Sequence, residues 1–219
     1  MVGTSSQPED HPASSRGEAA DHDGSHGTAS PGTSSYDQFM ARSQPIHPPH
    51  APLSDGVVAL RRRRASDLDV MAEASEDVDT RRWLDDRPMD AEARRTSLAR
   101  AEEAWRSGRA APLMIADAGT DEPVGLVNLE FRDDEVASVA YSVFPAYRGR
   151  GIAPRAVRLL TDWAFQGLAL HQVLLEADQE NLASVRVAEK CQFQPLGTRT
   201  ELREGKERTM LLFALTHPT

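Results

Sequence analysis

Apolar residues follow two kinds of pattern along the chain, and both begin near residue 55. Runs rich in β-branched and aromatic residues are typical of strands, and they occupy residues 57–61, 111–116, 124–132, 136–144, 171–177, 193–202 and 209–215. Apolar residues at helical spacing predict helices beginning at Ser66 or Asp67, near 80–85, at 90–106, from a start between 150 and 153 to a stop at Gly167, and at 182–191. The chain beyond residue 55 is therefore expected to mix strands and helices throughout.

The lengths of the connections indicate how these strands pair. Short turns join the three strands between residues 111 and 144, which predicts an antiparallel meander. A crossover helix of about 15 residues separates the strands at 136–144 and 171–177, so these two strands are expected to lie parallel with a right-handed connection. The last two strands read as an antiparallel hairpin. A ligand would lie at the carboxyl ends of the parallel pair, where the crossover helix begins.

A glycine- and arginine-rich turn precedes that crossover helix. It contains Arg148, Gly149, Arg150 and Gly151, and Pro154 suits the first helical turn because its missing amide would be unpaired there anyway. Free amides and the helix dipole favour an anion at such a terminus, and arginine is a good phosphate donor. The pattern predicts a site for a phosphate or pyrophosphate, although a plain tight turn would have the same composition.

Composition narrows the function classes. The protein has 219 residues, a formal net charge of −9 and one cysteine, Cys191, so an internal disulfide is impossible and a cysteine metal site is not expected. Acidic balance argues against nucleic acid despite the run Arg61–Arg64, which reads as a solvated strand end. The sequence has no long apolar run and no signal peptide, which predicts a cytoplasmic protein without a membrane partner.

The first 54 residues differ from the rest of the chain. They are rich in Ser, Pro, Gly and Asp, hold five of the seven histidines, and contain very few branched aliphatic residues. Such a segment buries too little apolar surface to offset its conformational entropy. We expect a disordered tail over 1–54 and one folded domain over 55–219; irregular histidine spacing gives no reason to expect a metal.

Two motifs in the sequence resemble those of a known protein family. R-G-R-G-I-A at 148–153 resembles the acetyl-CoA pyrophosphate motif R/Q-x-x-G-x-G/A of the GNAT superfamily of N-acetyltransferases, and the segment from Asn181 to Phe193 resembles the second cofactor segment of that family. The sequence around both motifs is most similar to the branch that contains the RimJ and RimL ribosomal-protein N-terminal acetyltransferases. Over about 56–215, the resemblance implies an α+β fold: a mixed, mostly antiparallel sheet of about six or seven strands with a central splayed parallel pair, flanked by about four helices.

The resemblance also implies a binding mode for acetyl-CoA, with no metal. The backbone amides that would hold the pyrophosphate are those of Arg148, Gly149, Arg150, Gly151, Ile152 and Ala153. Backbone groups of Ser142, Val143 and Phe144, at a bulged strand end, would bind the pantetheine arm, and Asn181 would reach its amide groups. An open sheet edge in such a fold would allow a homodimer.

The implied reaction is direct attack of a neutral amine on the acetyl thioester. Family members often place a tyrosine seven residues after the asparagine to protonate the thiolate, but this chain has Ala188 there. Ser184 has the nearest hydroxyl. We assign it the catalytic role of protonating the thiolate and also expect it to contact the cofactor. Glu130 and Tyr141 are both candidates to accept the ammonium proton.

The sequence supports three hypotheses about function to different degrees. The first is an N-acetyltransferase acting on a protein N-terminus or a small-molecule amine, and the second is a non-catalytic acyl-CoA-binding or sensing module. The third is a nucleotide-binding protein, which is disfavoured because the sequence contains neither standard glycine-rich nucleotide-binding motif.

Two residues after the last predicted helix have structural roles. Cys191 is expected in the core. Gln192 stands where the resemblance implies glycine, so a left-handed helix end would cost up to about 1 kcal/mol.

Overall fold

The computed structural model describes residues 42–84, 88–203 and 205–217. The strands are β1 (Leu53–Ser54), β2 (Val58–Arg61), β3 (Ala110–Asp117), β4 (Pro123–Phe131), β5 (Val136–Val143), β6 (Gln172–Asp178), β7 (Gln194–Arg203) and β8 (Lys206–Thr216). The helices are α1 (Leu68–Ser75), α2 (Val78–Leu84), α3 (Ala91–Arg106), α4 (Ile152–Leu168) and α5 (Leu182–Lys190), with 3₁₀ turns η1 (Ala65–Asp67) and η2 (Pro145–Tyr147). The order and type of the elements agree with the sequence prediction.

The strands form one sheet in the order β1-β2-β3-β4-β5-β6-β8-β7. Its neighbouring strands are antiparallel except β5 and β6, which are parallel and joined by α4. The mixed, mostly antiparallel α+β sheet is therefore confirmed. The described part of the chain has eight strands in place of six or seven and five α-helices in place of about four. The additional strand, β1, is two residues long, which is too short for a periodic signal in the sequence.

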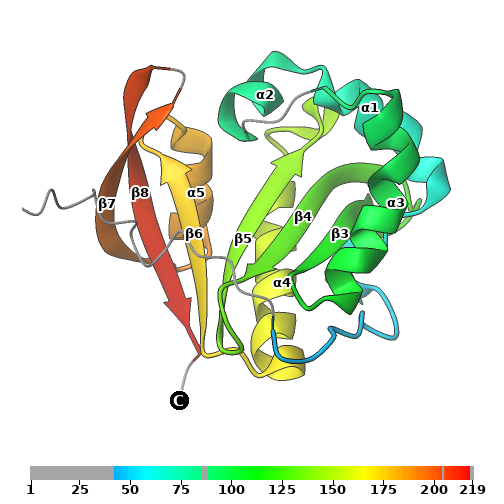
Figure 1. The fold of residues 1–219 in the computed structure, drawn as a ribbon, viewed down its shortest axis with the longest axis horizontal. Coiled ribbons are helices and arrows are strands. Elements are labelled where there is room, and N and C mark those ends of the chain that lie inside the picture. Colours follow the sequence, from blue (N-terminus) through cyan, green and yellow to red (C-terminus); the bar gives the residue numbers. More distant parts are fainter. Residues whose placement is uncertain (1–41, 85–87, 204, 218–219) are drawn as a thin grey trace, which may run out of the picture. The chain divides into compact units, whose positions relative to one another are not determined.

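The helices cover both faces of the sheet. Figure 1 shows α3 in front of the strands, α4 and α5 behind them, and α1 and α2 at the upper end of the sheet. Successive strand residues point to opposite faces, and on β5 the residues Ala137 and Val139 join the core that contains Ala156 and Leu160 of α4. The other face of the sheet packs against α1 through a smaller cluster that includes Met71 and Met114.

The parallel pair separates along its length, as expected. β5 and β6 pair only between Val136–Ser138 and Gln172–Leu174, and Figure 1 shows them diverging beyond that point. The expected bulge in β5 is not found, because β5 stays in register with β4 from Ala137 to Val143. The divergence leaves the edge of β5 from 139 to 143 facing an opening.

The end of the expected tail belongs to the folded part. Most of the range 1–54 lies outside the described residues, but from Arg42 the chain packs against the sheet. Ile46 is 4% exposed within the main core, and the Arg42 guanidinium donates to the Leu168 carbonyl at 3.1 and 3.2 Å and lies over the Phe131 ring. One buried aliphatic residue and one cation–π contact anchor this segment, and neither stands out in a Pro- and His-rich sequence.

The stop predicted at Gly167 is wrong by two residues. α4 continues to Leu168. The residue after it, Ala169, caps the helix in a left-handed conformation with φ of 54°. A Cβ at Gly167 would lie 2.7 Å from the Trp163 ring. The glycine therefore makes room for an indole one turn earlier and does not terminate the helix.

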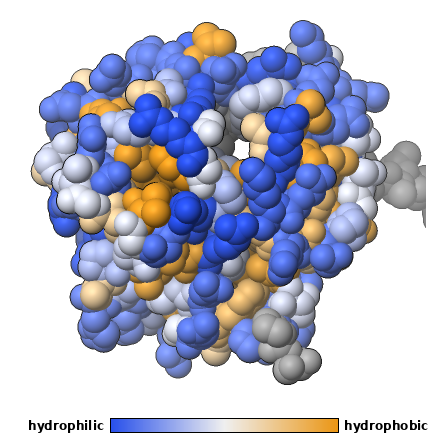
Figure 2. Space-filling view, turned by 180° about the vertical axis from the view of Figure 1, so that it is seen from behind, coloured by the Kyte–Doolittle hydropathy of each residue, from blue (hydrophilic) through white to orange (hydrophobic). Residues whose placement is uncertain are grey.

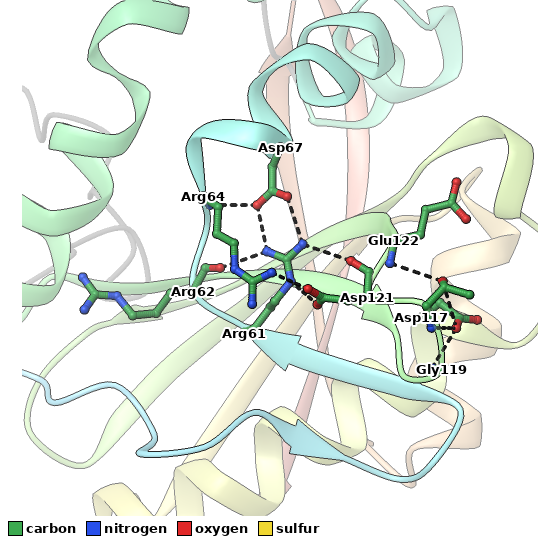
Figure 3. A network of polar contacts seen from close by, with 9 residues as sticks. Arg61, Arg62, Arg64, Asp67, Asp117, Gly119, Asp121 and Glu122 are labelled. Carbon is green, nitrogen blue, oxygen red and sulfur yellow. Dashed lines mark hydrogen bonds and ion pairs between the residues drawn. The ribbon is translucent and has the colours of Figure 1, made fainter.

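The arginine run at the end of β2 also differs from its expected role. Arg61 is 6% exposed and Asp67 is 1% exposed. Figure 3 shows the Arg61 guanidinium between Asp67, which it contacts at 2.8 and 2.9 Å, and Asp121 on the β3–β4 turn at 2.7 Å. Asp67 also accepts from the Arg64 amide, so it closes η1 and does not bond to an α1 amide as a side-chain cap. The network fixes the start of α1 to the edge of the sheet.

Candidate active site

A cavity of about 630 Å³ fills the separation between β5 and β6. β5 contributes the residues from Ser138 to Val143, the turn after it contributes Arg148, Gly149, Gly151, Ile152, Ala153 and Pro154, and α5 contributes Asn181, Ala183, Ser184, Arg186, Val187 and Lys190. Thr80 and Trp83 of α2 close another side. Seen from the α4 and α5 side, the surface is hollowed near its upper edge, with hydrophilic side chains beside the opening (Figure 2).

The start of α4 has the geometry of an anion cradle. Gly149 and Gly151 have φ of 76° and 75°, and a Cβ on either would meet no heavy atom within 4 Å. Left-handed backbone followed by the first turn of a 17-residue helix leaves several amides without helical partners. The helix begins at Ile152, inside the predicted window of 150 to 153. These residues fit a pyrophosphate group held by backbone amides.

The Arg148 side chain points away from that cradle. Its guanidinium donates to Thr80 at 2.9 Å and to the Val143 carbonyl at 3.2 Å, and it forms ion pairs with Asp77 and with Asp79. The hydrogen bond from Arg148 lowers the pKa of the Asp77 carboxyl. Arg148 therefore connects the cofactor turn to the beginning of α2.

Two of the predicted cofactor residues lie outside the cavity lining. The Phe144 side chain is 3% exposed and packs in the smaller core cluster, while its amide donates to the Val124 carbonyl at 2.9 Å. The Arg150 guanidinium lies 5.3 Å from the centroid of the Tyr147 ring. Ser142 and Val143, by contrast, line the cavity.

A pair of hydroxyl groups lies inside the cavity. The Tyr141 hydroxyl oxygen is 2.8 Å from the Ser184 Oγ, which joins β5 to α5. Burial raises the pKa of Tyr141 to about 12, although the hydrogen bond with Ser184 acts in the opposite direction. Asn181 caps α5, because its side-chain oxygen accepts from the Ser184 amide at 3.1 Å. The first turn of α5 thus places Ser184 against Tyr141.

Glu130 and Tyr141 lie on opposite faces of the sheet. Glu130 pairs with Ser138 across β4 and β5, whereas Tyr141 pairs with Val127, and even- and odd-numbered residues of β5 point to opposite sides. Both candidates still line the same cavity, because the cavity passes between the separated strands. Glu130 accepts from the Asn128 side chain at 2.8 Å.

A charged cluster beside Glu130 was missed by the sequence analysis. Glu176 of β6 pairs with Arg132 at 3.4 Å and with Arg199 of β7 at 2.8 Å, and all three side chains line the cavity. Asp178, two residues further along β6, pairs with Arg208 at 2.9 Å. The available signal was the pair of acidic residues at alternate positions in an otherwise apolar strand, which marks a polar face.

The two residues after α5 behave as expected. Cys191 is 5% exposed, its thiol donates to the Pro154 carbonyl at 3.4 Å, and burial raises its pKa to about 11. Gln192 has φ of 63°, the left-handed conformation that relatives accommodate with glycine. Cys191 is a core residue, and Gln192 adopts a strained backbone.

Comparison with known proteins identifies the family. The family model described as Acetyltransferase (GNAT) domain matches residues 58–194. The chain therefore belongs to the GNAT acetyltransferases. A relative from Bacillus licheniformis, named uncharacterized N-acetyltransferase p20, is 25% identical over 154 residues, which are 69% of this chain and 86% of that protein.

Solved structures share the fold. The ribosomal-protein-S5-alanine acetyltransferase from Vibrio fischeri superposes with a TM-score of 0.65 at 20% identity, over 76% of this chain and 96% of that one. The spermidine N-acetyltransferase from Vibrio cholerae, in complex with CoA and spermine, gives 0.65 at 19% identity, over 74% and 96%. Ribosomal-protein acetyltransferases are thus among the structural neighbours, as the resemblance implied.

Two further observations apply to residues 42–84, 88–203 and 205–217. No helix there combines the length and apolar character needed to cross a bilayer. No group of three or more His, Cys, Asp or Glu side chains in those ranges is arranged to hold a metal ion.

Proposed function

We propose that this protein binds acetyl-CoA at the start of α4 and transfers the acetyl group directly to a primary amine. The observation that carries the proposal is one continuous cavity that joins the Gly149–Gly151 amide cradle to the Tyr141–Ser184 hydroxyl pair. Bound acetyl-CoA would supply the activated acetyl thioester. Family membership and neighbours solved with CoA support this donor.

Tyr141 suits the role of a proton donor. With a pKa of about 12 its hydroxyl is protonated at neutral pH, so it does not serve as a base for the ammonium group. Its bond to Ser184 links two hydroxyls at the end of the pantetheine slot. We assign this pair the task of protonating the departing thiolate, which relatives give to a tyrosine at the position of Ala188.

Glu130 suits the role of the proton acceptor. It lies on the opposite face of the sheet from Tyr141, on the side covered by α1 and α2. An amine entering from that side would meet Glu130 before it reached the slot, while the donor is held from the α4 and α5 side. The two faces thus separate the acid and the base, as direct transfer between two substrates requires.

The acceptor class is a primary amine, either a peptide N-terminus or a small molecule such as a polyamine. The neighbours named for ribosomal protein S5 and for spermidine represent both. Carboxylates on the acceptor side of the cavity include Asp79, Glu130, Glu176 and Asp178. Asp79, Glu176 and Asp178 are paired with arginines, so the preference for an amine rests on family membership and on the role given to Glu130.

A second candidate function is acyl-CoA binding without transfer. Ala188 is fully buried and offers no hydroxyl at the position where the family resemblance implies a tyrosine in many members, which is the specific observation in its favour. The Tyr141–Ser184 pair argues for catalysis, because it supplies a hydroxyl from another strand.

The test is release of free thiol from acetyl-CoA in the presence of a panel of amines: peptides with different N-terminal residues, polyamines and amino acids. We expect turnover with at least one acceptor, and mass spectrometry should find that acceptor heavier by one acetyl group. Tyr141→Phe and Ser184→Ala should each lower kcat by about tenfold to a thousandfold while leaving acetyl-CoA affinity within about threefold. Tight binding of acetyl-CoA without turnover on any acceptor would establish the sensor instead.

A further inference from the structure

Positive charge is concentrated on the two helices that border the opening. The segments Pro145–Arg158 and Leu182–Cys191 contain six cationic residues and one carboxylate, in a protein with a formal net charge of −9. The six are Arg148, Arg150, Arg155, Arg158, Arg186 and Lys190. A local reversal of sign in an acidic protein marks a place where an anion is favoured.

Several of these cations already have partners. Arg148 pairs with Asp77, Arg155 pairs with Asp55 at 2.7 Å, and Arg150 lies over Tyr147. Arg186 and Lys190 differ, since both are exposed and both line the cavity. They are four residues apart on α5, so their side chains lie on the same side of that helix, one turn apart.

The pair lies directly beside the amide cradle. The Cys191 thiol donates to the Pro154 carbonyl, so the end of α5 is held against the first turn of α4. The Arg158 guanidinium donates to the Lys190 carbonyl, which adds a third cation at the same junction. Gly151, Pro154, Arg186 and Lys190 consequently border a single cavity.

We propose that Arg186 and Lys190 bind the 3′-phosphate of the ribose in acetyl-CoA. This rests on the proposed function: with the pyrophosphate on the α4 amides and the pantetheine directed inward to Ser184, the nucleotide end must extend outward past α5. Acetyl-CoA carries one phosphate more than the pyrophosphate, one ribose ring away. Two cations one helical turn apart at the outer edge of the cradle match that phosphate in charge and in position.

The experiment is titration calorimetry with acetyl-CoA and with its 3′-dephospho analogue, which keeps the pyrophosphate and the thioester. We expect the protein to bind acetyl-CoA about tenfold more tightly than the analogue. In the double variant Arg186→Gln/Lys190→Gln the ratio of the two Kd values should fall to about one. The control Arg100→Gln removes an exposed cation from α3 and should leave the ratio unchanged.

Because each variant is compared with itself on two ligands, a loss of folded protein cancels from the ratio. Equal binding of both ligands by the unmodified protein would refute this phosphate site while leaving the proposed function intact. A ratio that persists in the double variant would also refute it. Failure of either ligand to bind would refute the proposed function, and the phosphate site with it.

Discussion

Replacing Gly151 by glutamate tests the amide cradle most directly. Gly151 precedes Ile152, the first residue of α4, and lines the cavity. A Cβ added there would meet no heavy atom within 4 Å, so the substitution makes no steric clash at that atom. The carboxylate would stand at the helix terminus where the pyrophosphate is expected.

The expected loss has two separable parts. Any residue with a Cβ at φ of 75° strains the backbone by about 1–2 kcal/mol, which lowers stability. Two unit charges 4 Å apart repel by about 1 kcal/mol in water and about 4 kcal/mol near a protein surface. At about 1.4 kcal/mol per tenfold, the charge should weaken acetyl-CoA binding by about fivefold to a thousandfold.

Calorimetric Kd values for acetyl-CoA should be compared across three variants. Gly151→Ala adds the backbone strain without the charge and should weaken binding by less than about fivefold. Gly205→Glu is the matched control, because Gly205 in the β7–β8 turn has the same φ of 75° and equally open space but does not line the cavity. It should lose similar stability and keep normal affinity. Normal acetyl-CoA binding by Gly151→Glu would overturn the cradle assignment.

Three other predictions concern the residues around the site. Asp67→Asn removes one of the two carboxylates that pair with the buried Arg61 guanidinium, so we expect a loss of about 1–3 kcal/mol and a drop in Tm of about 2–12 °C by calorimetry, whereas Asp69→Asn, exposed on α1, should change Tm little. Burial raises the pKa of Asp67, but hydrogen bonds from Arg61 and Arg64 lower it by more, so the net shift is downward. The ionised carboxylate therefore contributes stability at neutral pH, and this contribution is lost as pH falls below about 4. The difference in Tm between the variant and the parent protein should shrink in that range. Gln192→Gly relieves a left-handed backbone and should raise stability by up to about 1 kcal/mol, whereas Gln194→Gly in β7 should lower it. Because the pKa of Tyr141 is about 12, the pH profile of kcat should show no tyrosine ionisation below about pH 11. A transition in kcat near pH 8 that disappears in Tyr141→Phe would contradict the acid role.

Local patterns were sufficient for the parts of the fold that depend on neighbours in sequence. The start of α4 followed from Pro154 and the paired glycines, whereas the left-handed conformation at Gln192 was suggested by the resemblance to the family. The parallel pair followed from the length of the crossover alone. In each case the deciding residues are within one helical turn or one connection of the feature.

Features that depend on distant partners could not be predicted in this way. Arg61 looked solvated because the charge that neutralises it from the other side, Asp121, is 60 residues further along the chain. Ile46 looked like part of a tail because its core neighbours come from elements that begin far beyond it. The same limit applied to Glu176, whose partner Arg199 reaches it only through the pairing of β6, β8 and β7.

Under the proposed function, the backbone and the side chain of Arg148 have different tasks. Its backbone belongs to the turn assigned to the donor, but its guanidinium contacts Asp77, Thr80 and the Val143 carbonyl. Thr80 also borders the cavity on the acceptor side. Because a guanidinium occupied by α2 is not free to pair with a phosphate, we expect the affinity of the turn for an anion to come mainly from its amides. The Arg148 side chain instead holds α2 against the turn.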